Sequence, residues 1–126
     1  MPYHKILHID DDEDDQEIFL TALGHITQEV EYTALDSAVE ALQQLSNSKM
    51  TADLIFLDLN MPQMNGQQFL IELKKHEHLK QIPVIVLSTS AHAPTIELVK
   101  ELGAHDFITK PDNFNEFIHT LRNILS

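Results

Sequence analysis

The sequence predicts an α/β fold, a doubly wound parallel sheet of five strands with helices on both faces. Short apolar runs of strand length alternate five times with longer stretches in which apolar residues recur at helical spacing. Two of the runs, 53–57 and 84–87, are apolar almost throughout, as expected for strands covered on both faces. Strands and helices that alternate in this way favour parallel strands joined by right-handed helical crossovers.

Each predicted strand is followed by its own helix, which gives a (βα)5 order. The first strand is predicted at 3–9 and precedes a helix at 14–24, which we expect Gly24 to end. The other four strands are predicted at 29–35, 53–57, 84–87 and 105–108. A helix at 93–102, ending at Gly103, lies between the last two strands.

The helices are predicted from the apolar residues that each would turn toward the sheet. Ser37 is a suitable N-cap for the second helix, because its hydroxyl can accept a bond from a free backbone N–H. The residues expected to face the core are Ile18, Phe19, Ala22 and Leu23 in the first helix, Val39, Leu42 and Leu45 in the second, Phe69, Leu70 and Leu73 in the third, and Phe114, Phe117, Ile118, Leu121 and Leu125 in the fifth.

Length and charge narrow the class of protein. The 126 residues fit one domain, which we predict to span residues 1–126. Cysteine is absent, which excludes disulfides and thiolate metal sites. The 20 acidic and 8 basic residues give a net charge of −12, which disfavours binding to nucleic acid or to an anionic membrane. With no apolar stretch near the roughly 20 residues that span a bilayer and no signal-peptide pattern, we expect a cytoplasmic protein.

Chemically active side chains follow four of the five predicted strands. Asp10 and Asp11 follow the first strand, Asp58 the third, Ser88 the fourth and Lys110 the fifth. In open parallel sheets, binding sites lie beyond the carboxyl ends of the strands, where the strand order reverses. If the first and third strands are neighbours, about 4.8 Å apart, their three carboxylates lie close together.

This set of side chains suits the transfer of a phosphoryl group. Clustered carboxylates retain protons unless a cation neutralises them, and Mg²⁺ suits a site of a few carboxylates, waters and phosphate oxygens. A carboxylate such as that of Asp58 can attack phosphorus and form an acyl phosphate. Lys110 would offer a compact positive charge to one phosphoryl oxygen, and Ser88 a hydrogen bond to another.

The same residues resemble the motifs of the receiver domains of two-component response regulators, in particular the single-domain, chemotaxis-regulator-like ones. The resemblance runs from Lys5 to about Leu125 and includes every motif of the family in order. These motifs are the acidic pair Asp10-Asp11, a D-x-x-M-P-x-M-x-G loop that begins at Asp58, the hydroxyl of Ser88, and Lys110-Pro111. The resemblance implies a flavodoxin-like sheet with the strand order 2-1-3-4-5.

The resemblance implies a role for each residue that would touch the phosphoryl group. Asp58 would be the phosphoacceptor, and Ser88 and Lys110 would bind the transferred group. Ser88 and Phe107 would form the switch, in which the hydroxyl moves toward the phosphoryl group and the ring turns inward. Ser88 stands where Thr is commoner and Phe107 where Tyr is common, so we expect looser coupling between them. The Lys110–Pro111 bond would be cis.

The resemblance also implies a metal and partner proteins. Mg²⁺ would be bound by Asp10, Asp11, Asp58 and the backbone carbonyl of Asn60. A sensor histidine kinase or a histidine phosphotransfer protein would donate the phosphoryl group. The protein would not be an enzyme toward other substrates, because it would catalyse only its own phosphorylation and dephosphorylation.

Two further groups of polar residues are predicted to have no part in the site. The acidic residues Asp12, Glu13, Asp14 and Asp15 are interpreted as solvated charges that favour the N-terminus of a helix. The eight histidines are interpreted as residues that bind no metal, since no spacing motif pairs them.

The sequence leaves the output of the switch open. No output domain follows the last predicted helix, so we expect either a switched face that binds a separate protein target or a relay of the phosphoryl group. Two other classes are weaker alternatives. An aspartyl phosphohydrolase would need a D-x-D-x-T motif after the first strand, which reads DDDED instead. A scaffold that is never phosphorylated would not need the complete set of Asp10, Asp11, Asp58, Ser88 and Lys110.

Overall fold

The fold predicted from the sequence is confirmed. The computed structural model describes residues 3–59, 61, 63–89 and 92–126. A single sheet has the strand order β2-β1-β3-β4-β5, with all pairs parallel. Its strands are β1 (Lys5–Ile9), β2 (Glu31–Leu35), β3 (Leu54–Asp58), β4 (Val84–Ser88) and β5 (Asp106–Thr109). The helices are α1 (Glu13–Gly24), α2 (Ala38–Ser46), α3 (Gly66–Lys74), α4 (Ala93–Glu101) and α5 (Phe114–Leu125).

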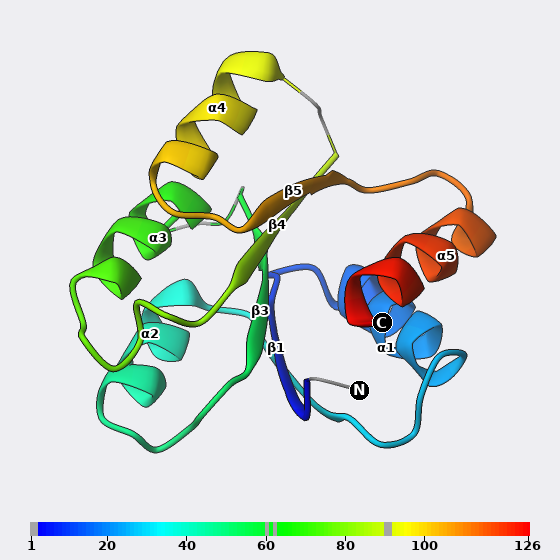
Figure 1. Cartoon of the computed structure of the whole chain (residues 1–126), viewed down its shortest axis with the longest axis horizontal. Coiled ribbons are helices and arrows are strands. Elements are labelled where there is room, and N and C mark those ends of the chain that lie inside the picture. Colours follow the sequence, from blue (N-terminus) through cyan, green and yellow to red (C-terminus); the bar gives the residue numbers. More distant parts are fainter. Residues whose placement is uncertain (1–2, 60, 62, 90–91) are drawn as a thin grey trace.

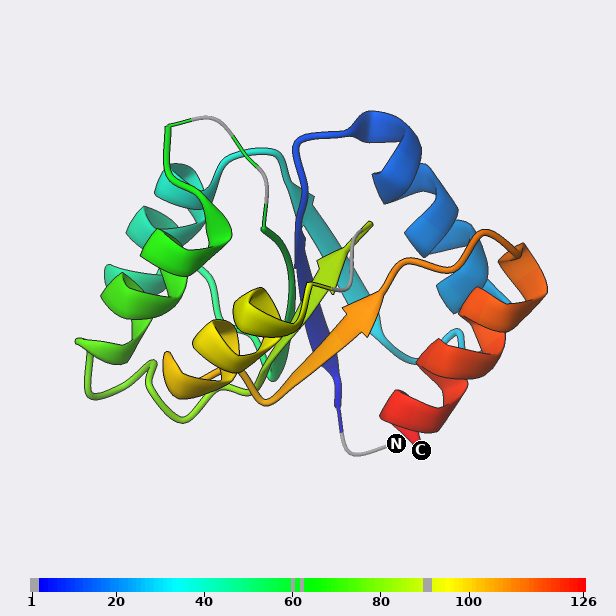
Figure 2. The ribbon, with the colours of Figure 1, turned by 90° about the horizontal axis from the view of Figure 1, so that it is seen from above.

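The helices form two layers around the sheet. Figure 1 shows α1 and α5 on one side of the strands and α2, α3 and α4 on the other, and Figure 2 shows the same division from above. We call these the α1/α5 face and the α2–α4 face. Within the described part of the chain, no helix has both the length and the apolar character needed to cross a membrane.

The sheet register moves several predicted strand ends. The β1–β2 ladder begins at the pair Lys5 and Glu31, so the residues predicted before them have no partner in it. At the other end, Asp58 pairs with Leu87 in the β3–β4 ladder, and Ser88 pairs with Thr109. The strands therefore carry Asp58 and Ser88 as their last residues, which fixes both residues more firmly than a loop would.

The two faces bury different side chains. On the α2–α4 face the core is almost wholly aliphatic, with Leu7, Leu57, Val86 and Leu73 among its members and Phe69 as its one buried aromatic residue. On the α1/α5 face the core contains three buried phenylalanines, Phe19, Phe56 and Phe117. Phe19 stacks or packs edge-on with His8, Tyr32, Phe56 and Phe117.

The helix caps agree with the residues that precede the helices. Ser37 accepts a hydrogen bond from the backbone N–H of Glu40, as predicted. Asn65 and Gln68 form a reciprocal capping box at the start of α3, which fixes where the chain leaves the loop after β3. After α4, Gly103 has φ +107°, a conformation that favours glycine.

Some of the predicted core faces are wrong in detail. Ile18 and Phe114 are 47% and 39% exposed. Helix α1 packs on the sheet through Phe19, Ala22 and Leu23, and α5 through Phe117, Leu121 and Leu125. In α2 the fully buried residues are Ala38, Ala41 and Leu45, whereas Val39 and Leu42 are only half-buried. The small side chains of Ala38 and Ala41 let α2 lie close to the sheet.

Candidate functional site

The sheet brings the predicted catalytic residues to one edge. Ile9 pairs with Leu57 in the β1–β3 ladder, so Asp10 and Asp58 come next on neighbouring strands. The backbone N–H of Lys110 donates to the carbonyl of Ser88 at 2.7 Å, which holds the chain after β5 beside the end of β4. Four residues that are far apart in the sequence are therefore neighbours at the carboxyl ends of β1, β3, β4 and β5.

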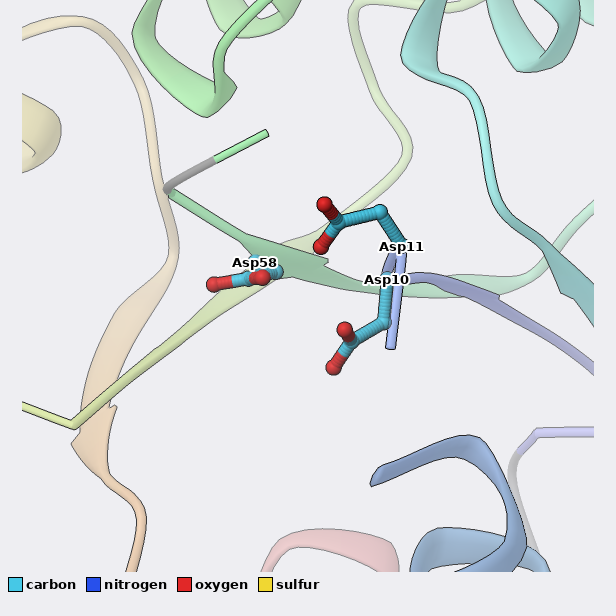
Figure 3. Close-up of side chains that lie close together, drawn as sticks. All are labelled: Asp10, Asp11 and Asp58. Atoms are coloured by element: carbon cyan, nitrogen blue, oxygen red, sulfur yellow. The ribbon is translucent and has the colours of Figure 1, made fainter. Parts of the chain in front are cut away.

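Three carboxylates meet at this edge. Asp10, Asp11 and Asp58 each offer an oxygen, and these oxygens all lie within 4.8 Å of one another. Figure 3 shows Asp10 and Asp11 projecting from the end of β1 with Asp58 at the end of β3 beside them. Asp10 and Asp58 are buried and Asp11 is exposed. Such a group of oxygen ligands is suited to a hard divalent cation, so the residues present fit the predicted metal site.

Asp10 is held in its ionised form despite its burial. The backbone N–H of Asp12 donates to Asp10 Oδ1 at 3.0 Å, and Lys110 Nζ donates to Asp10 Oδ2 at 3.2 Å. Burial raises the pKa of Asp10, but the nearby His8, the Asp12 N–H and Lys110 lower the pKa by more, so the net shift is downward. A carboxylate that stays ionised is available as a metal ligand.

Lys110 is the cation of the site. Its Nζ donates to Asp15 Oδ2 at 2.7 Å as well as to Asp10. Burial lowers the pKa of Lys110, but the hydrogen bond to Asp15 and the negative charges of Asp10 and Asp58 outweigh burial and raise it. The lysine therefore carries its full positive charge next to the carboxylate cluster.

A buried histidine lies directly beneath the carboxylates. His8 Nδ1 lies 2.9 Å from the hydroxyl of Tyr32, which also lies 3.3 Å from the carbonyl of Gln16. His8 Nε2 lies 3.5 Å from Asp10 Oδ2 and has no hydrogen-bond partner among the described residues. Gln16 in turn donates from its side chain to the carbonyl of Asp10 at 2.7 Å. The result is a polar network that links β1, β2 and α1 behind Asp10.

The two residues predicted to form the switch, Ser88 and Phe107, lie toward the other face. Strand alternation puts Ser88 on the same face as Val84 and Val86, which belong to the core under α2, α3 and α4. Phe107 is half-buried and packs against that same core. Ser88 itself is buried.

Gly66 lies tightly against the end of β3, next to the predicted phosphoacceptor Asp58. The N–H of Gly66 donates to the carbonyl of Leu59 at 3.0 Å, and a Cβ at Gly66 would lie 2.9 Å from the carbonyl oxygen of Asp58. Glycine is therefore required where α3 begins. The predicted role of the Asn60 backbone carbonyl concerns a residue outside the described part of the chain, as does Pro62 of the loop motif.

One predicted detail of the site is wrong. The Lys110–Pro111 bond is trans, since none of the peptide bonds in the described residues is cis. The trans isomer is the more stable one before proline by about 0.5–1 kcal/mol. The contacts of Lys110 with Asp10, Asp15 and Ser88 are all made with this trans bond.

Sequence reasoning missed two residues near the site. Asp15 lies in the first turn of α1, as predicted, but its carboxylate contacts Lys110, so the interpretation as a solvated charge is wrong. Its nearness to Lys110 depends on how α1 crosses the sheet edge, which no local pattern reveals. His8 could have been found, because residues two apart on a strand share a face and Asp10 is two residues further on. Asp12 does cap α1, through bonds from the N–H groups of Asp14 and Asp15.

Comparison with known proteins identifies the family. A family model described as the response regulator receiver domain matches residues 6–122. The chain belongs to this family. Receiver domains of two-component response regulators interact with histidine kinases and phosphotransfer proteins, and the cluster of Asp10, Asp11 and Asp58 fits phosphoryl acceptance in such a domain.

The curated relatives include two-component response regulators and differ in length. The two-component response regulator ORR5 of Oryza sativa subsp. japonica is 33% identical over 106 residues, which cover 84% of this chain and 77% of that protein. Across the relatives, the share of the relative's own length that this chain spans ranges from 18% to 88%. The receiver unit thus occurs in proteins of very different sizes.

Solved structures of receiver domains have the same fold. The phosphorylated cyanobacterial phytochrome response regulator RcpA has a TM-score of 0.86 and 32% identity, with 97% of this chain and 91% of that chain covered. The Mn²⁺-bound form of the response regulator Rcp1 has a TM-score of 0.84 and 30% identity, with 96% and 91% covered.

Proposed function

We propose that this receiver domain is phosphorylated on Asp58 in the presence of Mg²⁺. The main support is that carboxylate oxygens of Asp10, Asp11 and Asp58 lie within 4.8 Å of one another at the end of the sheet. Lys110 donates a hydrogen bond to Asp10 beside them. A phosphorylated neighbour and a Mn²⁺-bound neighbour of the same fold support both parts of this proposal.

The transfer would convert the Asp58 carboxylate into an acyl phosphate. A carboxylate oxygen attacks phosphorus as the bond between phosphorus and the donor's imidazole nitrogen breaks, and the electron pair of that bond stays on the nitrogen. Lys110 neutralises charge on the incoming phosphoryl oxygens, and the Ser88 hydroxyl donates a hydrogen bond to one of them. Mg²⁺, when bound by Asp10, Asp11, Asp58 and the Asn60 carbonyl, would supply further charge neutralisation.

The same proposal covers the partners and the place of action. The donor is a sensor histidine kinase or a histidine phosphotransfer protein, and Ser88 and Phe107 alter the face that binds a separate protein target or the next protein of a relay. The net charge of −12 favours proteins with basic surfaces over nucleic acid. The proposal places the protein in the cytoplasm. It includes no turnover of other substrates.

Intact-mass measurement after incubation with acetyl phosphate tests this proposal. We expect a single phosphoryl adduct that requires Mg²⁺, disappears with a chelator and is absent from Asp58→Asn. A suitable control is Asp53→Asn, which changes an exposed aspartate at the opposite end of the sheet and should leave the adduct unchanged. An adduct of equal yield on Asp58→Asn would show that another residue is the acceptor.

A further inference from the structure

Lys110, which is predicted to bind the phosphoryl group, has a close partner on α1. Its ammonium is 2.7 Å from Asp15 Oδ2 and 3.2 Å from Asp10 Oδ2, so the shorter contact is with a residue of α1. Lys110 is 17% exposed and Asp15 33%, which puts the pair at the rim of the site and not in open solvent. The cation assigned to the phosphoryl group is thus already bound by a neighbouring acid.

Asp15 is the fixed member of this pair. It lies in the first turn of α1, where its backbone N–H faces the Asp12 cap at 3.4 Å. A negative charge is stabilised there by the N-terminus of the helix. Lys110 has a long, flexible side chain, and a cavity of about 290 Å³ is lined by Lys110, Asp15 and Asp10. The lysine therefore has room to shift its ammonium, whereas the backbone of Asp15 is held in the first turn of α1.

Phosphorylation of Asp58 would add acceptor oxygens and negative charge beside the Lys110 ammonium. An ammonium has three donors and no more, and it binds as a point charge. A phosphoryl group at Asp58 carries more negative charge than the carboxylate that it replaces, with strong acceptor oxygens. Asp15 also adds an anion close to the place where that charge arrives. Every bond that Lys110 keeps with Asp15 is a bond that it does not make to the phosphoryl group.

We propose that Asp15 is a positioning residue that competes with the phosphoryl group on Asp58 for Lys110 and thereby weakens the hold of the site on that group. This inference rests on the proposed role of Asp58 as the acceptor. Asp15 acts through Lys110 and does not itself touch the phosphoryl group.

The sign of the expected effect separates this role from a structural one. Binding of beryllofluoride, a mimic of the phosphoryl group, is measured by ¹⁹F NMR at saturating Mg²⁺. Asp15→Asn keeps the size of the side chain but removes its charge, and we expect it to bind beryllofluoride about fivefold more tightly than the wild type, the scale of a partly exposed ion pair. Damage to the fold would weaken binding instead.

Two matched variants control for charge and shape. Asp14→Asn removes the same charge from the same helical turn, but Asp14 is exposed and its side chain makes no contact with Lys110 in the described structure, so it should shift affinity by less than twofold or so. Asp15→Glu keeps the charge and should restore the weaker binding of the wild type. In a Lys110→Ala background, Asp15→Asn should have no more effect than Asp14→Asn, because the residue through which it acts is gone.

The results distinguish failure of this inference from failure of the proposed function. If the wild type binds beryllofluoride only with Mg²⁺ and Asp58, the proposed function stands. Equal or weaker binding by Asp15→Asn then overturns the competition, and so does an equal gain from Asp14→Asn. If the wild type does not bind beryllofluoride at all, the acceptor role and the competition both fall.

Discussion

The two faces of the sheet differ in the residues that they carry near the site. On the α1/α5 face, strand alternation places His8 and Asp10 beside the aromatic cluster, and Lys110 reaches Asp10 and Asp15 there. On the α2–α4 face, Ser88 and Phe107 lie against an aliphatic core. Charge is therefore concentrated on one side of the strands, while the residues proposed to report phosphorylation lie on the other. The strands themselves connect the two.

This division raises the question of whether the faces unfold together. Leu73 of α3 and Leu121 of α5 are both fully buried, one in each core. Leu73→Ala and Leu121→Ala are each expected to lower the free energy of unfolding by about 2–5 kcal/mol, because each leaves a cavity. These are the largest effects that we predict, and urea unfolding followed by circular dichroism measures them.

Tyrosine fluorescence sharpens the same experiment. The chain has two tyrosines and no tryptophan, and both Tyr3 and Tyr32 pack against the α1/α5 core. Fluorescence therefore reports one face, whereas circular dichroism reports the helices of both. We expect coincident transitions in both variants, because the two cores share the same five strands. Separate midpoints for the two signals would show that the two faces unfold independently.

A smaller effect is expected where the α2–α4 face meets the site. In Gly66→Ala, the new Cβ would lie 2.9 Å from the Asp58 carbonyl oxygen and from Leu59 Cα, which are backbone atoms that cannot move aside cheaply. The gain in helix propensity, about 1 kcal/mol, works against this overlap. We expect a net loss of about 1–3 kcal/mol in the free energy of unfolding, together with slower phosphorylation of Asp58.

Gly24→Ala is the matched control for that substitution. At Gly24 the nearest atom to a new Cβ is 4.0 Å away, so alanine should leave stability unchanged or slightly raised and phosphorylation unaffected. Equal behaviour of the two variants would mean that the loop after β3 relaxes without disturbing Asp58.

Much of this arrangement could be predicted from the sequence, for definite reasons. The apolar runs at 53–57 and 84–87 predict buried parallel strands, and the polar residue at the end of each strand indicates the edge of the sheet that holds the site. Asp10, Asp11 and Asp58 meet as predicted because their strands are neighbours.

The parts that could not be predicted depend on contacts between distant segments. Asp15 and Lys110 are 95 residues apart, and only the packing of α1 against the sheet edge joins them. Ile18 is exposed because of the way α1 is rotated about its axis. The apolar pattern of the helix does not determine this rotation to within one residue. The isomer of the Lys110–Pro111 bond depends on a free-energy difference of about 1 kcal/mol or less, which the residue types do not decide.

Substitutions in the buried polar network of the α1/α5 face measure how much its hydrogen bonds contribute to the free energy of unfolding. Tyr32→Phe removes the hydroxyl that lies 2.9 Å from His8 Nδ1, and we expect a loss of about 1 kcal/mol in the free energy of unfolding. His8→Phe keeps the stacking on Phe19 and should lose a similar amount.

Combining the two substitutions shows whether these groups act as a pair. Each single variant leaves a buried polar partner behind, whereas the double variant removes both, so its loss should be smaller than the sum of the two. Strict additivity, measured by urea unfolding, would indicate that the 2.9 Å contact contributes no coupling.

The smallest effect is expected at the end of the sheet that lies away from the site. Asp53 Oδ2 accepts bonds from the backbone N–H groups of His4 and Lys5, both at 2.9 Å, and these bonds lower the pKa of its carboxyl. A carboxyl whose pKa is lower in the folded state than in the unfolded state stabilises the fold above the unfolded value of about 3.9 and loses this contribution as the pH falls through the folded value.

Asp53→Asn should therefore differ most from the wild type at neutral pH. The two proteins should converge as the pH falls below about 3.9 and through the lowered pKa of Asp53, where the wild-type carboxyl becomes neutral in the folded protein too. Urea midpoints measured between pH 7 and pH 3 follow the difference between the two proteins, which cancels the titration of all other groups. Because Asp53 is exposed, the difference should be small at every pH. A difference that does not change with pH would mean that the carboxylate charge contributes nothing to the bonds with His4 and Lys5, and that any loss in the variant comes from the shape of the side chain alone.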